Sequence, residues 1–177
     1  MASSAALVFI NGEFWGVYNF RERYSPEYVS DHTGANKDTV TVIENANNLY
    51  NQNPDVAFVD GSGVAGYADE FNWLLDFADT HDLSVPENFA WIESKLDLDS
   101  LIDLCAVRVF FNATDWPENN IKLWRDTAPD GADARWHFVL LDTDWGMGMK
   151  QTTGPEMNLL FILLNYSNGT YTKDCPL

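Results

Sequence analysis

The sequence is poor in cysteine and histidine, and each shortage removes a class of function. It has two cysteines and three histidines in 177 residues, and Cys105 and Cys175 form no C-x-x-C pair. A zinc site or a dithiol redox motif therefore has no support. His32, His81 and His137 are scattered along the chain, so a Ser-His-Asp nucleophile has no support either.

Basic residues and long apolar runs are also scarce. Ten lysines and arginines stand against 27 aspartates and glutamates, which gives a formal net charge of -17. Such a field repels nucleic acids and anionic membranes, so we expect neither as a partner. No run of about 18 apolar residues occurs, and residues 1–4 lack the features of a secretory signal. The compartment stays open, because a signal could precede Met1 in a longer protein.

Apolar and aromatic residues are present in the amounts that a folded domain needs. Apolar residues make up 46% of the chain and aromatic residues 14%, enough for one buried core. No internal repeat or low-complexity linker divides the sequence. We therefore expect a single domain.

The first predicted elements are a β-hairpin and a short helix. Residues 7–10 and 14–20 read as strands around an Asn-Gly pair, which supplies the positive φ that hairpin turns need. A helix is predicted from Pro26 to His32. Ser25 is placed to be its N-cap, and Gly34 is placed to end it.

The rest of the chain is predicted to be helical in its middle, with strands on either side. Asp99 is expected to cap a helix whose apolar positions almost encircle it, which predicts burial. Residues 45–63 show little periodicity and are expected to form a long loop or a loop with one helical turn. The fold class is thus α+β, with β-hairpins flanking a helical middle. Further strands are predicted over 39–43, 121–124 and 136–141, and helices over 66–80, 87–96, 100–112 and 158–164.

A D-x-x-x-x-N pattern, Asp115 with Asn120, follows the predicted central helix. Pro117 forbids continued helix, so the pattern lies in a loop. Protein kinases use the same spacing in their catalytic loop, where the Asp accepts the substrate hydroxyl proton and the Asn holds a metal ion. The His-Arg pair of ordinary kinases is replaced here by Ala113-Thr114. The pattern by itself is equally compatible with an Asp115 that closes an Asx turn.

A second acidic pattern, Asp142-x-Asp144-x-Gly146, directly follows the apolar residues 138–141. Kinases place their Mg²⁺-binding Asp at the end of an apolar strand and shortly before a glycine. The order of helix, loop, hairpin and strand-end Asp is that of the kinase lower lobe. A solvated turn or a structural Ca²⁺ site is the alternative interpretation of the two carboxylates.

Three ordered segments resemble the CotH (spore coat protein H) kinase family. Residues 11–22 resemble its NGxYxGxYxLxE signature, residues 111–120 its catalytic loop, and residues 140–148 its (W/Y)DxDxxxG element. The resemblance covers roughly residues 7–165. It implies an atypical protein-kinase-like fold and transfer of the γ-phosphoryl group of ATP to protein Ser or Thr.

The resemblance also implies roles for individual residues. Asp115 corresponds to the catalytic Asp, and the predicted metal ligands are Asn120, Asp142 and, as a second acidic neighbour, Asp144. Glu22 closes the first motif and is expected to face either the nucleotide or a structural basic partner. The implied cofactors are ATP with Mg²⁺ or Mn²⁺, and Ca²⁺ is the alternative ion. The resemblance suggests an extracellular, cell-surface or spore-associated location, and the compartment itself stays open.

The sequence departs from the family at both ends. Intact members carry strands with phosphate-binding basic residues before the hairpin, and apolar helices continue where this chain becomes polar after Leu164. We therefore expect residues 1–177 to be a partial, truncated kinase-like domain with the catalytic-loop and metal-binding portion. Two alternatives stay open. One is an inactive pseudokinase or interaction domain; the other is a Ca²⁺-stabilised extracellular carbohydrate-associated module, suggested by Trp116, Trp124, Trp136 and Trp145.

Overall fold

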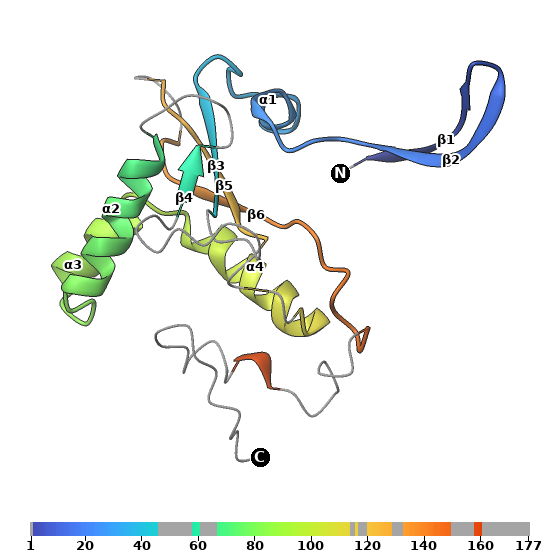
Figure 1. Cartoon of the computed structure of the whole chain (residues 1–177). Coiled ribbons are helices and arrows are strands. Elements are labelled where there is room, and N and C mark those ends of the chain that lie inside the picture. The colour runs from blue at the N-terminus through green and yellow to red at the C-terminus, as the bar shows by residue number, and fades with distance from the viewer. Residues whose placement is uncertain are drawn as a thin grey trace.

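The computed structural model describes residues 2–45, 58–60, 67–113, 116, 120–128, 133–149 and 158–160. Within them, a two-stranded hairpin and a four-stranded antiparallel sheet accompany the helices (Figure 1). This mixture confirms the α+β class. A kinase-like arrangement of the elements stays a prediction.

The N-terminal hairpin consists of β1 (Ser3–Ile10) and β2 (Glu13–Arg21), as predicted. Asn11 and Gly12 have φ of 52° and 86°, the two positive values that match the twist of a tight hairpin. The register shifts by a bulge between Val8 and Phe9. Figure 1 shows this hairpin projecting away from the other elements.

Helix α1 (Pro26–Thr33) begins at the predicted residue and ends one residue beyond the predicted His32. The Ser25 hydroxyl accepts a hydrogen bond from the Tyr28 amide at 3.4 Å, and Gly34 ends the helix with φ of 79°. Val29 packs with two valines of β3 in a small core cluster. This cluster attaches α1 to the central sheet.

The central sheet has the order β4-β3-β5-β6, and all its pairs are antiparallel. Ile43 of β3 lies opposite Leu123 of β5, and both are fully buried. β5 and β6 form the second predicted hairpin, but β6 ends at Val139, two residues before the predicted end at Leu141. The strands span Val40–Asn45 (β3), Phe58–Asp60 (β4), Lys122–Asp126 (β5) and His137–Val139 (β6).

Strand β4 corrects the expectation of a loop over residues 45–63. Residues 58–60 pair with 43–45 of β3. Three residues are too few to show a strand period, so pairing with β3 marks this strand where a local pattern cannot.

Helices α2 (Tyr67–Thr80) and α3 (Pro86–Glu93) lie side by side in Figure 1. Phe71 and Leu74 of α2, Ile92 of α3, Leu123 and Trp136 belong to the main core cluster. The core therefore lies between α2, α3 and the sheet. In the part of the chain that the structure describes, no helix is long and apolar enough to span a membrane.

Helix α4 (Leu98–Phe111) differs from its prediction in two respects. Its N-cap is Asp97, so the prediction of Asp99 as the cap is wrong. The Asp97 amide donates to the Trp136 carbonyl at 2.9 Å, which holds the chain there and lets the helix begin two residues earlier. The predicted burial on all sides is also wrong, because Ile102 and Phe110 are 62% and 75% exposed. Of the predicted helix at 158–164, only residues 158–160 lie within the described residues.

Candidate active site

The candidate site is organised by Arg108, a fully buried arginine near the C-terminal end of α4. Its Nη1 donates to the carbonyl of Asp142 at 2.5 Å, and its Nη2 donates to the carbonyl of Asn120 at 3.1 Å. Nη2 also donates to the Leu141 carbonyl. One guanidinium thus binds the segment before β5 and the segment after β6.

These bonds bring two of the four predicted site residues into one region. Asn120 and Asp142 are far apart in the sequence, but their carbonyl oxygens bind the same planar group. A planar guanidinium with two ordinary hydrogen bonds keeps the two oxygens within about 8 Å of each other. The segments that carry the candidate metal ligands are therefore neighbours.

Both residues have a backbone conformation that most side chains avoid. Asn120 has φ of 60° and Asp142 has φ of 45°. Asn and Asp tolerate this left-handed region better than other non-glycine residues, yet it still stores strain. Such outliers are common at functional sites, where the surrounding structure holds them in place. Here the carbonyls of both strained residues are held by Arg108.

The close contact between Gly146 and the end of α4 explains why the acidic turn ends in a glycine. A Cβ on this buried residue would lie 2.5 Å from the carbonyl oxygen of Phe111, the last residue of α4. The adjacent Met147 amide donates to that same carbonyl at 2.6 Å. The turn from Asp142 to Gly146 therefore rests directly on the end of α4, the helix that carries Arg108.

The predicted site residues differ in their surroundings. Asp142 and Asp144 are exposed, and Asn120 is partly buried. Asp115 lies outside the described residues, so its meeting with the other three stays a prediction. Close to it in sequence, Ala113 is fully buried and Trp116 is 5% exposed.

The oxygen donors present suit a hard divalent cation. Among the described residues, no group of three or more His, Cys, Asp or Glu is placed to hold a metal ion. A Mg²⁺ ion that takes one or two carboxylates, waters and substrate phosphates needs no such group. The amide oxygen of Asn120 and the carboxylates of Asp142 and Asp144 are donors of the required type. The identity of the ion and the binding of a nucleotide stay predictions.

Tyr24 connects the N-terminal segment to the residue that follows β6, two positions before Asp142. Its hydroxyl donates to the carbonyl of Leu140. The pKa of Tyr24 is raised to about 12, mainly by burial of the hydroxyl and to a smaller extent by the nearby Tyr28. The segment that links β2 to α1 is thereby attached beside the candidate site.

Glu22 lies at the base of the hairpin. One carboxylate oxygen accepts a hydrogen bond from the Ala2 amide at 2.5 Å, and the other lies 3.8 Å from Nε2 of His32. Of the two roles expected for Glu22, these contacts fit the structural one, in which the carboxylate faces a basic partner.

Arg108 is the residue that sequence reasoning missed. It is the one basic residue in the helix from 98 to 111, whose other residues are apolar or acidic except for Ser100. A lone arginine among buried apolar positions is rarely tolerated without specific partners, and that anomaly was the available signal.

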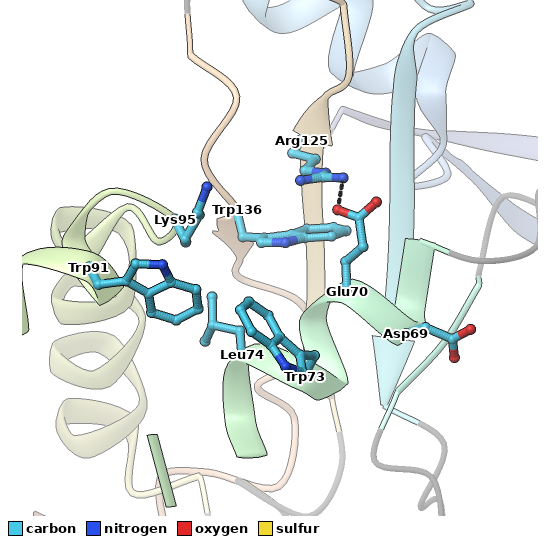
Figure 2. A pocket seen from close by; sticks show the side chains of 8 residues that line it. All are labelled: Asp69, Glu70, Trp73, Leu74, Trp91, Lys95, Arg125 and Trp136. Atoms are coloured by element: carbon cyan, nitrogen blue, oxygen red, sulfur yellow. Dashed lines mark hydrogen bonds and ion pairs between the residues drawn. The ribbon is translucent and has the colours of Figure 1, made fainter. Parts of the chain in front are cut away.

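A separate hollow of about 390 Å³ lies beside α2 and α3 (Figure 2). Figure 2 shows Trp136 across its middle, with Arg125 above it and Leu74 and Trp73 of α2 below. The lining residues come from α2, from α3 and the segment just after it, from β5, and from the residue just before β6: Asp69, Glu70, Trp73, Leu74, Trp91, Lys95, Arg125 and Trp136. None of the four predicted site residues belongs to this lining.

Comparison with known proteins gives one match. The family model described as CotH kinase protein matches residues 2–175, nearly the whole chain. No curated protein matches the chain, and no solved structure does. The three ordered motifs and the match over residues 2–175 agree, and the chain belongs to the CotH kinase protein family.

Proposed function

We propose that this chain carries the catalytic-loop and metal-binding portion of a protein kinase that transfers the γ-phosphoryl group of ATP to Ser or Thr hydroxyls of a protein substrate. The observation that carries the proposal is the Arg108 guanidinium, which binds the backbone of both Asn120 and Asp142. In a chain of this family, those two segments are the ones expected to hold the metal-nucleotide complex.

The proposed roles follow from the chemistry of each side chain. Asp115 accepts the proton of the substrate hydroxyl as its oxygen attacks the γ-phosphorus and the bond to ADP breaks. Asn120 and Asp142 supply oxygen ligands, and Asp144 adds negative charge beside them. When bound, Mg²⁺ or Mn²⁺ neutralises charge on the phosphates. Arg108 acts on the reaction only through the backbone it positions.

The net charge gives a further reason for metal dependence. A chain with a formal charge of -17 repels free ATP, so an acidic site gains affinity for the nucleotide only with divalent cations. Asp142 and Asp144 are exposed and can meet such cations. Nucleotide binding should therefore depend on the metal.

An inactive pseudokinase or interaction domain is the second candidate, and the hairpin β1–β2 favours it. Large exposed apolar surfaces of this kind mark interaction sites. Its exposed apolar side chains, each between 46% and 69% exposed, are Leu7, Phe9, Ile10, Phe14, Trp15, Val17, Tyr18 and Phe20.

Calorimetric titration with ATP, with and without Mn²⁺, separates the binding roles. Asp142→Asn should weaken the metal-dependent part of nucleotide binding, because it removes a charged ligand. Asp31→Asn is the matched control, since Asp31 is an exposed carboxylate on α1. Equal affinity with and without metal in all three proteins would contradict the metal assignment.

Transfer of radiolabelled phosphate tests the reaction, using this chain and a longer protein that contains it. Asp115→Ala should lower kcat by about 10²- to 10⁴-fold and change the KM for ATP far less. Full activity in this variant would contradict the role of Asp115. Metal-dependent ATP binding without any transfer in the longer protein would establish the pseudokinase alternative.

A further inference from the structure

The hollow beside α2 and α3 concentrates aromatic surface. Three of the chain's seven tryptophans line it. Trp136 is 2% exposed and forms a wall, Trp91 is partly buried, and Trp73 is 58% exposed. Figure 2 shows Trp91 and Trp73 on either side of Leu74, facing the same space as Trp136. A largely exposed indole at the edge of a hollow offers a flat apolar face to a ligand.

The aromatic rings support one another. The centroids of Trp73 and Trp91 lie 5.0 Å apart in an edge-to-face arrangement. Phe77 packs against both, at 4.1 Å from Trp91 and 6.3 Å from Trp73. Rings held in this way lose little rotamer freedom when a ligand binds, which favours affinity.

The charged groups of the hollow cancel one another. Glu70 forms an ion pair with Arg125, and the Arg125 Cζ lies 4.8 Å from the ring centroid of Trp136. Asp69 and Lys95 complete the charged lining. Two carboxylates and two cations sum to zero, whereas the whole chain carries -17. The lining thus matches an uncharged ligand.

Other ligand classes fit this lining less well. A quaternary ammonium group would be attracted by the aromatic rings and the two carboxylates but repelled by the two cations, so the charged lining gives it no net attraction. A phosphate group would meet two carboxylates as well as two cations. An extended proline-rich peptide needs a long groove, whereas this hollow is bounded by α2, α3 and β5.

We propose that this hollow binds a neutral carbohydrate chain. The C–H face of a pyranose ring stacks on Trp73, and its hydroxyls accept bonds from Lys95 and Arg125 and donate to Glu70. The volume of about 390 Å³ lies in the range of about 300–1,000 Å³ that is usual for small-molecule sites. The ligand class is a neutral pyranose oligosaccharide.

The inference is independent of the proposed phosphoryl transfer. Arg125 is near the far end of β5 from Asn120, and an extended chain of that length spans on the order of 15 Å. A bound saccharide therefore leaves the Arg108-centred region open. Its binding can be measured without ATP or metal.

The test is a titration of the whole chain with neutral hexasaccharides of glucose, mannose and N-acetylglucosamine, followed by calorimetry and tryptophan fluorescence. We expect saturable binding of at least one of them and a loss of about tenfold or more in Trp73→Ala, because stacking area is removed. Trp15→Ala is the matched control, because Trp15 is 62% exposed on the distant hairpin. It should bind as the wild type does.

A second variant covers the case in which Trp73→Ala fails to fold. Lys95 is exposed and lies after α3, and Lys95→Ala should weaken binding several-fold with unchanged circular dichroism. The proposal is overturned if no saccharide binds more tightly than about 1 mM. Wild-type affinity in both Trp73→Ala and Lys95→Ala also overturns it, as does Trp73-dependent binding of a proline-rich peptide in the absence of any saccharide binding.

Discussion

At the scale of single residues, Arg108 is the side chain that links the two segments of the candidate site. Its planar fork of donors reaches three carbonyls from inside the protein. A lysine has a single ammonium group and cannot reproduce this geometry. Arg108 is therefore a positioning residue, and its effect on function is indirect.

Arg108→Lys should lower the free energy of unfolding by about 1–3 kcal/mol, because at least one buried carbonyl loses its donor. Urea unfolding measures this change. Arg23→Lys is the control, since Arg23 is exposed, and it should stay within about 0.5 kcal/mol of the wild type. Equal stability of Arg108→Lys and the wild type would contradict the positioning role.

Gly146→Ala should destabilise the protein by about 1–3 kcal/mol, because its Cβ would lie 2.5 Å from the Phe111 carbonyl oxygen. Gly34→Ala is a useful comparison, since Gly34 has open space around it and a φ of 79°, so its cost is conformational only. NMR spectra should show shifted amides from Asp142 to Met147 in Gly146→Ala alone. Unshifted amides there would mean that α4 does not support the acidic turn.

The raised pKa of Tyr24 predicts that the stability of the protein depends on pH. Its pKa in the folded protein, about 12, lies above the ordinary value of 10. The contribution of Tyr24 to the free energy of unfolding is therefore complete below pH 10 and is lost as pH rises toward 12. Tyr24→Phe should lose about 1 kcal/mol at pH 8 through the missing hydrogen bond to Leu140, and this difference should shrink above pH 10.

Two measurements check the role of Tyr24. Absorbance at the tyrosinate band should show one fewer late-titrating tyrosine in Tyr24→Phe. Denaturant unfolding at several pH values should show the shrinking difference between the two proteins. A constant difference up to pH 11 would contradict the assigned pKa.

At the scale of elements, the hairpin β1–β2 and the central sheet should differ in stability. A two-stranded hairpin that stands alone is marginally stable in water. The pair β3–β5 instead carries the fully buried Ile43 and Leu123. The hairpin is fastened at its base by the Ala2–Glu22 bonds.

Amide hydrogen exchange should therefore be faster in β1 and β2 than in β3 and β5, because local opening of the hairpin breaks few packed contacts. Exchange measured at two protein concentrations provides the control for self-association through the exposed aromatic residues. Equal protection of both regions in dilute protein would show that the hairpin is covered.

At the scale of the whole molecule, the excess of negative charge opposes folding. Raising the ionic strength from 0.01 M to 0.15 M shortens the screening length from about 30 Å to about 8 Å. The melting temperature should rise, by about 2–4 °C for each 1 kcal/mol of repulsion removed. A melting temperature that falls with salt would mean that ion pairs outweigh this repulsion.

Magnesium chloride at equal ionic strength separates general screening from specific binding. It should raise the melting temperature further than sodium chloride does, by mass action on the folded state. The extra rise should be smaller in Asp142→Asn and unchanged in Asp31→Asn. Equal effects of the two salts would remove the support for a divalent site in the unliganded chain.

The hairpin turn and the limits of α1 could be predicted because their causes are local. Asn11-Gly12 adopts positive φ by its own sterics, and Ser25 and Gly34 act on the nearest helix turn. The acidic turn that ends at Gly146 was also visible as a pattern. The sequence did not show why that turn needs a glycine, because a Cβ there would clash with the carbonyl of Phe111, which belongs to another element.

The sequence alone determined the family, the α+β class and the candidate residues Asp115, Asn120, Asp142 and Asp144, since motifs and short-range preferences are written in neighbouring residues. Only the tertiary structure decided that Arg108 joins Asn120 to Asp142, that β4 exists, and that one side of α4 is exposed. Each of these depends on backbone or side chains distant in the chain. A buried arginine takes whichever carbonyls the fold brings to it, and no local pattern specifies them.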